Sequence, residues 1–385
     1  MVNVFIVASK GIPAKYGGFE TFVENLTGRK KSPNIKYFVS CMGTTEDEFE
    51  YNNSHCFSIP LRRQNPVFRI LNVSSALTWV EKYIRKNKNK NEKNIVYILG
   101  CRVGLLMKKH KKALHKLNCL IMCNPDGLEW KRDKWNRFEK KILLLSEKNL
   151  LKNSDFIVCD SINIRKYILE RYKFIIPEKS AFIAYGSDVA NSIAKESDAV
   201  NWLNEKGTSL NDYYLVVGRF VPENNFELMI KEFMKSHTKK KLLIISNVEK
   251  NSFYETLSRN LNFEKDNRIV FAGTLYDSEL IKKIRENAFA YLHGHSVGGT
   301  NPSLLEAMAS TDINILYDVP FNREVANDQC LFFNGENGNL SNLIDEVDAN
   351  RSFFAKKLHP KSIILNKYSW NNIVEQYEQL FLNLR

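Results

Sequence analysis

Short apolar runs that alternate with amphipathic stretches, in two successive series, constrain this chain most. The first series predicts strands at residues 2–8, 36–41, 55–59, 95–100, 120–123, 156–159 and 181–184. The second series predicts strands at residues 213–217, 241–246, 269–272 and 290–292. Stretches with helical spacing of apolar residues lie between them, at 74–85, 135–151, 226–233, 253–261 and 278–287. Strands that alternate with helices indicate parallel sheets covered on both faces, and therefore an α/β fold.

The two series imply two domains, which is also the number that a length of 385 residues favours. We expect one Rossmann-like domain over residues 1–190, a polar linker over 191–211 and a second Rossmann-like domain over 212–365. Residues 366–385 carry apolar side chains at helical spacing, so they are expected to form a helix that packs back on the N-terminal domain. A ligand would then lie in a cleft between the domains, at the carboxyl ends of the strands.

Residues 293–310 combine the end of an apolar run, a glycine-rich loop and a helix start. Thr300 or Asn301 can cap a helix, and Pro302 suits the first helical position, which needs no amide donor. A helix that begins directly after such a loop favours an anion, because its free N–H groups and its dipole point at the loop. Glu306 lies one turn further on, where a carboxylate could accept hydrogen bonds from sugar hydroxyls. The alternative is an ordinary strand–helix turn with a surface glutamate.

Two further loops follow predicted strands. Residues 11–18 form a glycine-containing loop before a helical stripe, but they match neither the dinucleotide fingerprint nor a P-loop. Gly218 and Arg219 come directly after a strand of the second series. A guanidinium at that edge suits a diphosphate, since its fork donates two parallel hydrogen bonds. The alternative for Arg219 is a plain surface residue.

Basic residues are concentrated in the first half of the chain. Residues 1–186 contain 34 Lys and Arg against 17 Asp and Glu, whereas the remainder contains 22 against 26. Such a surface suits anionic lipid headgroups or nucleic acid, and the alternative is a merely solvated lysine-rich face. We find no apolar run of the roughly 20 residues that a membrane span requires. The first residues read as a strand rather than a signal peptide, and the seven scattered cysteines read as reduced core residues, as in a cytoplasmic protein.

Four segments carry a resemblance to a known family. They are residues 10–23 (KGIPAKYGGFETFV), 124–135 (NPDGLEWKRDKW), 217–225 (VGRFVPENN) and 294–308 (GHSVGGTNPSLLEAM). The chain resembles the family 4 glycosyltransferases of the two-domain GT-B fold. More narrowly, the second segment makes it similar to the bacterial rhamnosyltransferases that build capsule and cell-wall polysaccharides.

The resemblance implies a set of residues that bind a nucleotide-sugar donor. These are Gly17, Gly18, Arg219, Asn224, Tyr276, His295, Thr300, Asn301, Ser303 and Glu306, with His293 close to the donor sugar. Arg219 would pair with the diphosphate and Glu306 with the ribose. The family often has a lysine at the position of Asn224 and a glutamate at the position of Gly298. The second departure fits a different donor sugar, such as a 6-deoxyhexose.

The resemblance also implies a mechanism. Transfer would proceed with retention by front-face substitution, in which the leaving diphosphate accepts the acceptor's proton. Asp126 and Arg219 would be the catalytic residues, and Asp126, Glu129, Lys131 and Arg132 would bind the acceptor. No metal or other cofactor is expected.

The predicted reaction moves a rhamnosyl group from dTDP-rhamnose to a polyprenyl-diphosphate-linked sugar. The enzyme would be cytoplasmic and peripheral on the inner face of the plasma membrane, bound to anionic lipid through its basic N-terminal domain and not to nucleic acid. Three alternatives stay open. They are a transferase with a UDP- or GDP-linked donor, a sugar-nucleotide epimerase of the same fold, and a basic nucleic-acid-binding protein.

Overall fold

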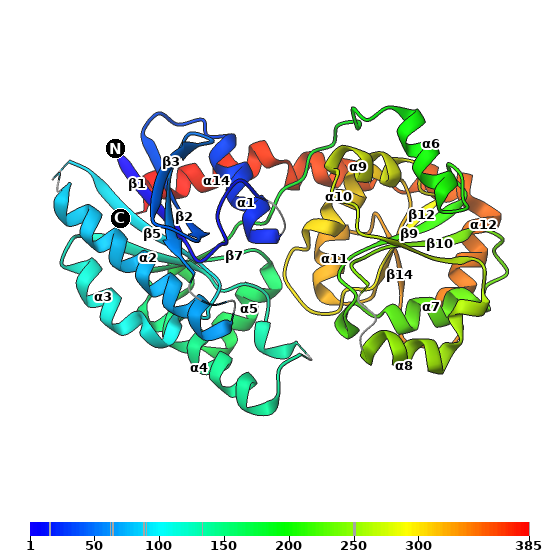
Figure 1. Ribbon diagram of the computed structural model, residues 1–385, viewed down its shortest axis with the longest axis horizontal. Helices are drawn as coiled ribbons and strands as arrows, with labels where there is room; N and C mark the ends of the chain where they lie inside the picture. Colours follow the sequence, from blue (N-terminus) through cyan, green and yellow to red (C-terminus); the bar gives the residue numbers. More distant parts are fainter. Residues whose placement is uncertain are drawn as a thin grey trace. The chain divides into compact units, whose positions relative to one another are not determined.

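The computed structural model describes residues 1–385 except 15, 16, 62, 64, 88, 90, 133, 249–251 and 385. The chain divides into two compact units (Figure 1). The first comprises Met1–Gly186 and Trp370–Arg385, and the second comprises Ser187–Ser369. Residues 191–211, which the sequence predicts as a linker, contain helix α6 (Glu196–Glu205). Ala199 and Leu203 of this helix are fully buried in the second unit, so polar composition concealed two core positions.

The first unit contains a mainly parallel sheet with strand order β3-β4-β2-β1-β5-β6-β7-β8. Its strands are β1 (Val2–Val7), β2 (Ile35–Gly43), β3 (Asp47–Tyr51), β4 (Ser54–Pro60), β5 (Lys93–Leu99), β6 (Cys119–Asn124), β7 (Phe156–Cys159) and β8 (Ser180–Phe182). Its longer helices are α1 (Gly18–Gly28), α2 (Pro66–Lys86), α3 (Met107–His115), α4 (Arg137–Asn153), α5 (Ile162–Arg171) and α14 (Trp370–Asn383). The α/β prediction is confirmed, with one difference: β3 runs antiparallel to β4 at the sheet edge.

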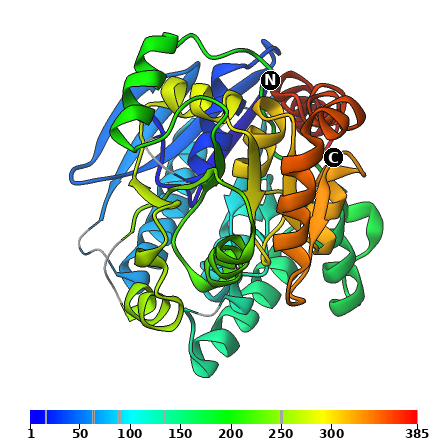
Figure 2. The ribbon, with the colours of Figure 1, turned by 90° about the vertical axis from the view of Figure 1, so that its right-hand side faces the viewer.

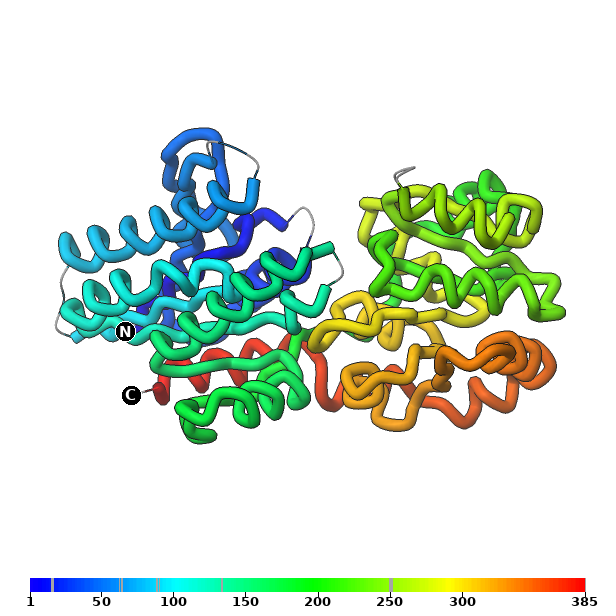
Figure 3. Tube along the Cα trace, turned by 90° about the horizontal axis from the view of Figure 1, so that it is seen from below, coloured from blue at the N-terminus to red at the C-terminus, as the bar shows by residue number. Residues whose placement is uncertain are grey.

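Helices cover both faces of this sheet. Phe5 of β1 packs edge-on against Tyr83 of α2. Tyr97 of β5 points the other way, because it follows the residue that pairs with Phe5 and side chains alternate along a strand. Its hydroxyl lies 3.1 Å from that of Tyr377 of α14. Helices α2, α3 and α4 lie side by side in one layer (Figure 3), and α1 and α14 pack together on the opposite face.

The second unit contains a fully parallel sheet with strand order β11-β10-β9-β12-β13-β14. Its strands are β9 (Tyr213–Val217), β10 (Lys241–Ile245), β11 (Ile269–Gly273), β12 (Ala290–His293), β13 (Asn314–Tyr317) and β14 (Leu331–Phe333). Its further helices are α7 (Phe226–Lys235), α8 (Ser252–Leu261), α9 (Ser278–Glu286), α10 (Pro302–Ser310), α11 (Pro320–Ala326), α12 (Asn339–Lys357) and α13 (Pro360–Ile363). Adjacent residues Tyr213 and Tyr214 belong to two different core clusters, one on each face of this sheet. Figure 2 shows α7 and α12 side by side on one of these faces.

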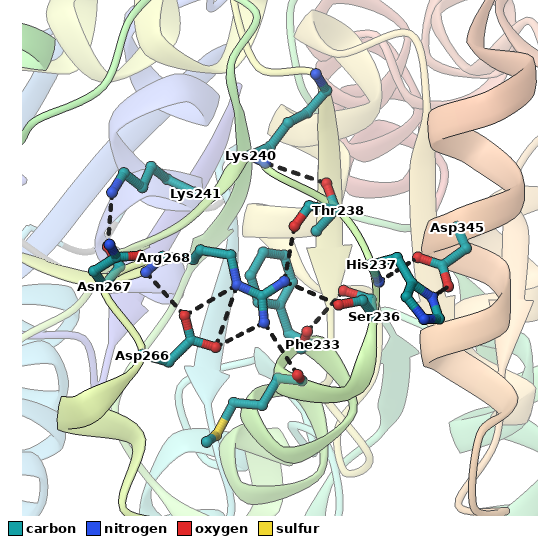
Figure 4. A network of polar contacts seen from close by, with 11 residues as sticks. Phe233, Ser236, His237, Thr238, Lys240, Lys241, Asp266, Asn267, Arg268 and Asp345 are labelled. Carbon is teal, nitrogen blue, oxygen red and sulfur yellow. Dashed lines mark hydrogen bonds and ion pairs between the residues drawn. The ribbon is translucent and has the colours of Figure 1, made fainter.

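A largely buried arginine, Arg268, organises the amino-terminal edge of the second sheet (Figure 4). The Arg268 guanidinium donates to the backbone carbonyls of Met234, Ser236 and Thr238 at 3.0, 2.9 and 2.8 Å. It also bonds both carboxylate oxygens of Asp266, the shorter contact being 2.7 Å. Arg268 therefore holds the connection between α7 and β10 in place. Among the described residues, no helix is both long and apolar enough to cross a membrane.

Candidate active site

Two loops meet at the carboxyl edge of the second sheet, because they follow the neighbouring strands β9 and β12. Asn225 Nδ2 donates to the Gly294 carbonyl at 2.7 Å, and Ser296 N donates to the Glu223 carbonyl at 3.0 Å. Gly218 lies against His295, because a Cβ added at Gly218 would be only 3.1 Å from Cε1 of the His295 ring. The sequence segments 217–225 and 294–308 are thus brought together as one structure.

Arg219 lies at this edge, and its side chain is exposed. Asn224, which is buried, donates from Nδ2 to the Arg219 carbonyl at 2.8 Å and so fixes the backbone from which the guanidinium projects. Within the described part of the chain, Arg219 takes part in no ion pair. An arginine without an internal counterion is available for an external anion. Asn224 acts here on the protein backbone, so its predicted contact with the donor stays a prediction.

Helix α10 begins as the sequence predicts. Asn301 accepts a hydrogen bond from Ser303 N at 2.9 Å, and Pro302 occupies the first helical position. The Ser303 hydroxyl lies 3.1 Å from the Val217 carbonyl and 3.0 Å from the Tyr291 hydroxyl, which ties the helix start to β9 and β12. Thr300 is buried at the same turn. The positive end of the helix dipole therefore lies at the loop next to Arg219.

Glu306 has a partner that the sequence did not reveal. Its carboxylate lies 2.7 Å from Nη2 of Arg285, which is buried on α9. The Glu306 side chain is still 43% exposed, so it keeps accessible surface for a ligand. Arg285 lies at the buried position next to Ile284, and an arginine on the inner face of a helix is the signal that could have identified it.

Two histidines stack at the end of β12. The rings of His293 and His295 are 4.3 Å apart and nearly parallel. Burial, and secondarily the neighbouring His295, lowers the pKa of His293 well below its usual value, so His293 is neutral. Neither of its ring nitrogens has a hydrogen-bond partner in the described structure. His295 is partly exposed and closer to solvent.

Tyr276 is separated from this group. It follows β11 at the edge of the sheet, and β10 lies between β11 and β9. Its side chain is 76% exposed. Its predicted position beside a nucleotide base stays a prediction.

The glycine loop of the first unit is already occupied by carboxylates of its own helix. Lys10 N donates to Glu20 Oε1 and Ala14 N donates to Glu24 Oε2, both at 2.7 Å. Gly17 has a φ of 130°, and a Cβ there would lie 2.0 Å from Glu20 Oε2. A carboxylate beside Gly17 opposes a second anion in that position. That Gly17 and Gly18 bind a diphosphate stays a prediction.

Residues 124–135 of the first unit form a loop organised around Glu129. Its carboxylate binds Arg102 at 2.7 Å, Arg132 at 3.0 Å and Lys134 at 3.0 Å. Burial alone would raise the pKa of Glu129, but these three cations hold it below its usual value. Glu129 therefore fixes a cationic group, a role that differs from the predicted direct contact with an acceptor. Arg102 enters from the end of β5, so only the tertiary structure could add it.

Asp126 lies at the turn that opens this loop. Its backbone is left-handed, with φ of 62°, and its amide donates to Asn124 Oδ1 at 2.8 Å. Burial raises the pKa of Asp126, although Arg132 acts in the opposite direction. Lys131 extends over the ring of Trp130 at 5.6 Å. Asp126, Lys131 and Arg132 thus lie within one loop, as the sequence implies. The described residues contain no cluster of His, Cys, Asp or Glu suited to a metal ion.

Each unit matches a protein-family model. Residues 204–358 match the family model described as Glycosyl transferases group 1, and residues 1–188 match a model described as a domain of unknown function, DUF1972. No curated protein matches the chain in sequence.

Solved structures resemble the chain over its whole length. Sucrose-phosphate synthase from Thermosynechococcus elongatus has 15% identity and a TM-score of 0.78, over 100% of this chain and 98% of that chain. Anabaena HepE in complex with UDP-glucose has 12% identity and a TM-score of 0.74, over 100% of both chains. A glycosyltransferase from Rickettsia africae has 16% identity and a TM-score of 0.73, over 100% of this chain and 99% of that chain. At these identities the structural similarity establishes a shared fold. The chain therefore has the GT-B fold of these glycosyltransferases, with a glycosyl transferases group 1 domain at residues 204–358.

Proposed function

We propose that the chain transfers a rhamnosyl group, with retention, from dTDP-rhamnose to a polyprenyl-diphosphate-linked sugar. One observation carries the donor half of this proposal. At a single edge of the second sheet, an arginine without an internal counterion, the start of a capped helix and a partly exposed carboxylate are held together. The arginine and the helix start suit a diphosphate, and the carboxylate suits sugar hydroxyls.

These groups would act mainly on the leaving group. The bond from the sugar C1 to the donor diphosphate breaks while a bond from C1 to the acceptor oxygen forms on the same face. The departing diphosphate takes the acceptor's proton and retains its electron pair. Arg219 and the α10 dipole would stabilise the charge that develops on this diphosphate, which is the largest catalytic contribution that such a site can make.

Glu306 would recognise the donor ribose. Arg285 holds its carboxylate through Nη2, and the remaining exposed surface of that carboxylate can accept a hydroxyl. A dTDP donor offers only a 3′-hydroxyl, whereas a UDP donor offers two neighbouring hydroxyls. The contribution of Glu306 to binding should therefore be larger for UDP than for dTDP.

The loop at 124–135 supports the acceptor half of the proposal. Arg102, Arg132 and Lys134 outnumber the single carboxylate of Glu129 that they share, and Lys131 is exposed beside them. The surplus positive charge suits the diphosphate of a lipid-linked acceptor. Asp126 would orient the acceptor hydroxyl.

A second donor is favoured by a specific observation. Structures of the same fold contain UDP or UDP-glucose, as the HepE complex does. Transfer from a UDP-linked hexose is therefore the alternative. Gly298 supports the rhamnosyl proposal instead, because the resembled family often has a glutamate there, whereas the φ of 147° at Gly298 disfavours any side chain.

The test compares dTDP, UDP, GDP, ADP and a short oligonucleotide in thermal unfolding of the full chain. A ligand at about 100 times its Kd adds about 2.7 kcal/mol of stability. We expect dTDP to stabilise most, and Arg219→Ala to abolish the effect. Arg259→Ala, which removes another exposed arginine of the second unit, is the matched control. Stabilisation by UDP alone would assign a UDP-linked donor in place of dTDP-rhamnose. Stabilisation by the oligonucleotide alone would refute the transferase proposal.

A further inference from the structure

Helix α4 exposes a stripe of large apolar side chains. Phe138, Ile142 and Leu145 are 72%, 39% and 52% exposed. Their spacing of four and three residues places them on one face, along the first turns of the helix. The opposite face is buried at Glu147 and Leu151, so the helix already packs against the rest of the first unit. We call Phe138, Ile142 and Leu145 the α4 stripe.

Positive charges surround the α4 stripe. Arg137, Lys141 and Lys148 are exposed on the same helix. The carboxylate of Glu139 is engaged with the Asn136 amide in a capping box, and that of Glu147 is buried. Helix α3 lies beside α4 (Figure 3) and adds three exposed lysines, Lys108, Lys109 and Lys112, with exposed Lys116 directly after it. An apolar stripe with basic flanks is the pattern of a helix that lies in the plane of an anionic bilayer.

The α4 stripe begins directly after the loop with the cationic group. Helix α4 starts two residues after Trp135, and its first turns contact the short helix at Glu129–Lys131. The ammonium groups of Lys131 and Lys134 lie over the rings of Trp130 and Trp135, respectively. Tryptophan is enriched at the level of lipid headgroups. A helix inserted through the α4 stripe would therefore hold the cations of residues 102–134 at the depth of a lipid diphosphate.

We propose that the α4 stripe inserts into the surface of an anionic bilayer, with Arg137, Lys141 and Lys148 on the headgroups. This inference rests on the proposed function, in which the acceptor is lipid-linked. Two other occupants fit less well. In a twofold contact with a second copy the same lysines would oppose one another, and three side chains cover far less than the roughly 800 Å² per partner of a stable interface. Nucleic acid would engage the lysines but would leave the aliphatic side chains without a role.

The experiment measures flotation of the full chain with vesicles of phosphatidylcholine alone, or of phosphatidylcholine and phosphatidylglycerol in equal parts. We expect binding to the mixed vesicles only. The triple variant Phe138→Ser/Ile142→Ser/Leu145→Ser should bind on the order of a hundredfold more weakly. Lys141→Gln/Lys148→Gln should bind roughly thirtyfold more weakly, because each basic residue near such a surface contributes about 1 kcal/mol. The matched control is Phe353→Ser/Ile193→Ser/Leu365→Ser, which removes the same residue types from exposed positions of the second unit.

Each outcome has one meaning. Unchanged flotation of the triple variant, or an equal loss in the control, would overturn the proposal. Loss of self-association in sedimentation, with flotation retained, would assign the α4 stripe to a second copy. Stabilisation by dTDP serves as the folding check and as the separate test of the donor site. If dTDP stabilises the chain but the chain does not float, the membrane proposal is refuted and the proposed donor site stands. If the chain floats but no nucleotide stabilises it, the donor site is refuted and the membrane proposal stands. Phe138→Ser alone provides a milder variant should the triple variant fail to fold.

Discussion

Replacing Arg268 with alanine should destabilise the second unit far more than removing a similar arginine from its surface. Arg268 and Asp266 have side chains only 18% and 14% exposed. The guanidinium also donates to three backbone carbonyls, one in the last turn of α7 and two between α7 and β10. Alanine would leave those carbonyls and a poorly hydrated carboxylate without their donor. Removing one member of a buried pair costs about 3–5 kcal/mol, and the residual exposure here favours the lower end, about 3 kcal/mol.

Arg323 supplies the control. It forms a similar two-point pair with Asp318 and also lies over a phenylalanine ring, but its side chain is 51% exposed. Arg323→Ala should therefore cost far less than Arg268→Ala, because solvent screens an exposed ion pair. Urea unfolding gives the two free energies, and hydrogen exchange at residues 234–241 locates the change. Equal losses in the two variants would refute the reasoning.

The pH dependence of the Arg268 effect has a fixed sign. The side-chain hydrogen bonds from Arg268 hold the pKa of Asp266 below its usual value. A lowered carboxyl pKa contributes stability that is present above the unfolded pKa, about 3.9, and is lost as the pH falls through the folded pKa. The deficit of Arg268→Ala relative to the wild type should therefore narrow as the pH drops below about 4. A deficit that widens there would contradict the assignment.

Three further predictions follow from the site. Asn301→Ala should lower the stability of α10 by about 1 kcal/mol in thermal unfolding, whereas Asn301→Asp should keep the cap. Arg285→Met should weaken nucleotide binding in calorimetry about tenfold, on the order of 1.4 kcal/mol, because Glu306 loses its orienting partner. Unchanged affinity would show that Arg285 has no role in donor binding. Burial raises the pKa of Asp126, so the acid limb of the pH–rate profile should lie above the usual carboxyl pKa of about 3.9. Asp126→Asn should abolish that limb, and an unchanged limb would assign it to another group.

The strand predictions agree with the structure for most buried strands, although the buried strand β13 was not predicted. Residues 156–159 and 213–217 match β7 and β9 to the residue, because an uninterrupted apolar run can only be buried on both faces of a sheet. Strand β3 was not predicted, since Asp47–Tyr51 is mostly polar and exposed at an antiparallel edge. Helix α2 begins at Pro66, before the predicted start at residue 74. Its first turns expose Val67 and Leu71, so they lack the one-sided apolar pattern by which the helix was recognised.

The candidate site divides in the same way. The sequence by itself determined what depends on neighbours along the chain: the alternating α/β pattern, a helix cap at Thr300 or Asn301 and the position of Glu306 one turn into α10. The tertiary structure alone decided which distant residues complete these features. Arg285 reaches Glu306 from α9, Arg102 reaches Glu129 from the end of β5, and Glu20 takes up the space beside Gly17. A hydrogen bond or ion pair depends on atomic positions within a few tenths of an ångström, and spacing in the sequence fixes such positions only within one turn or one strand.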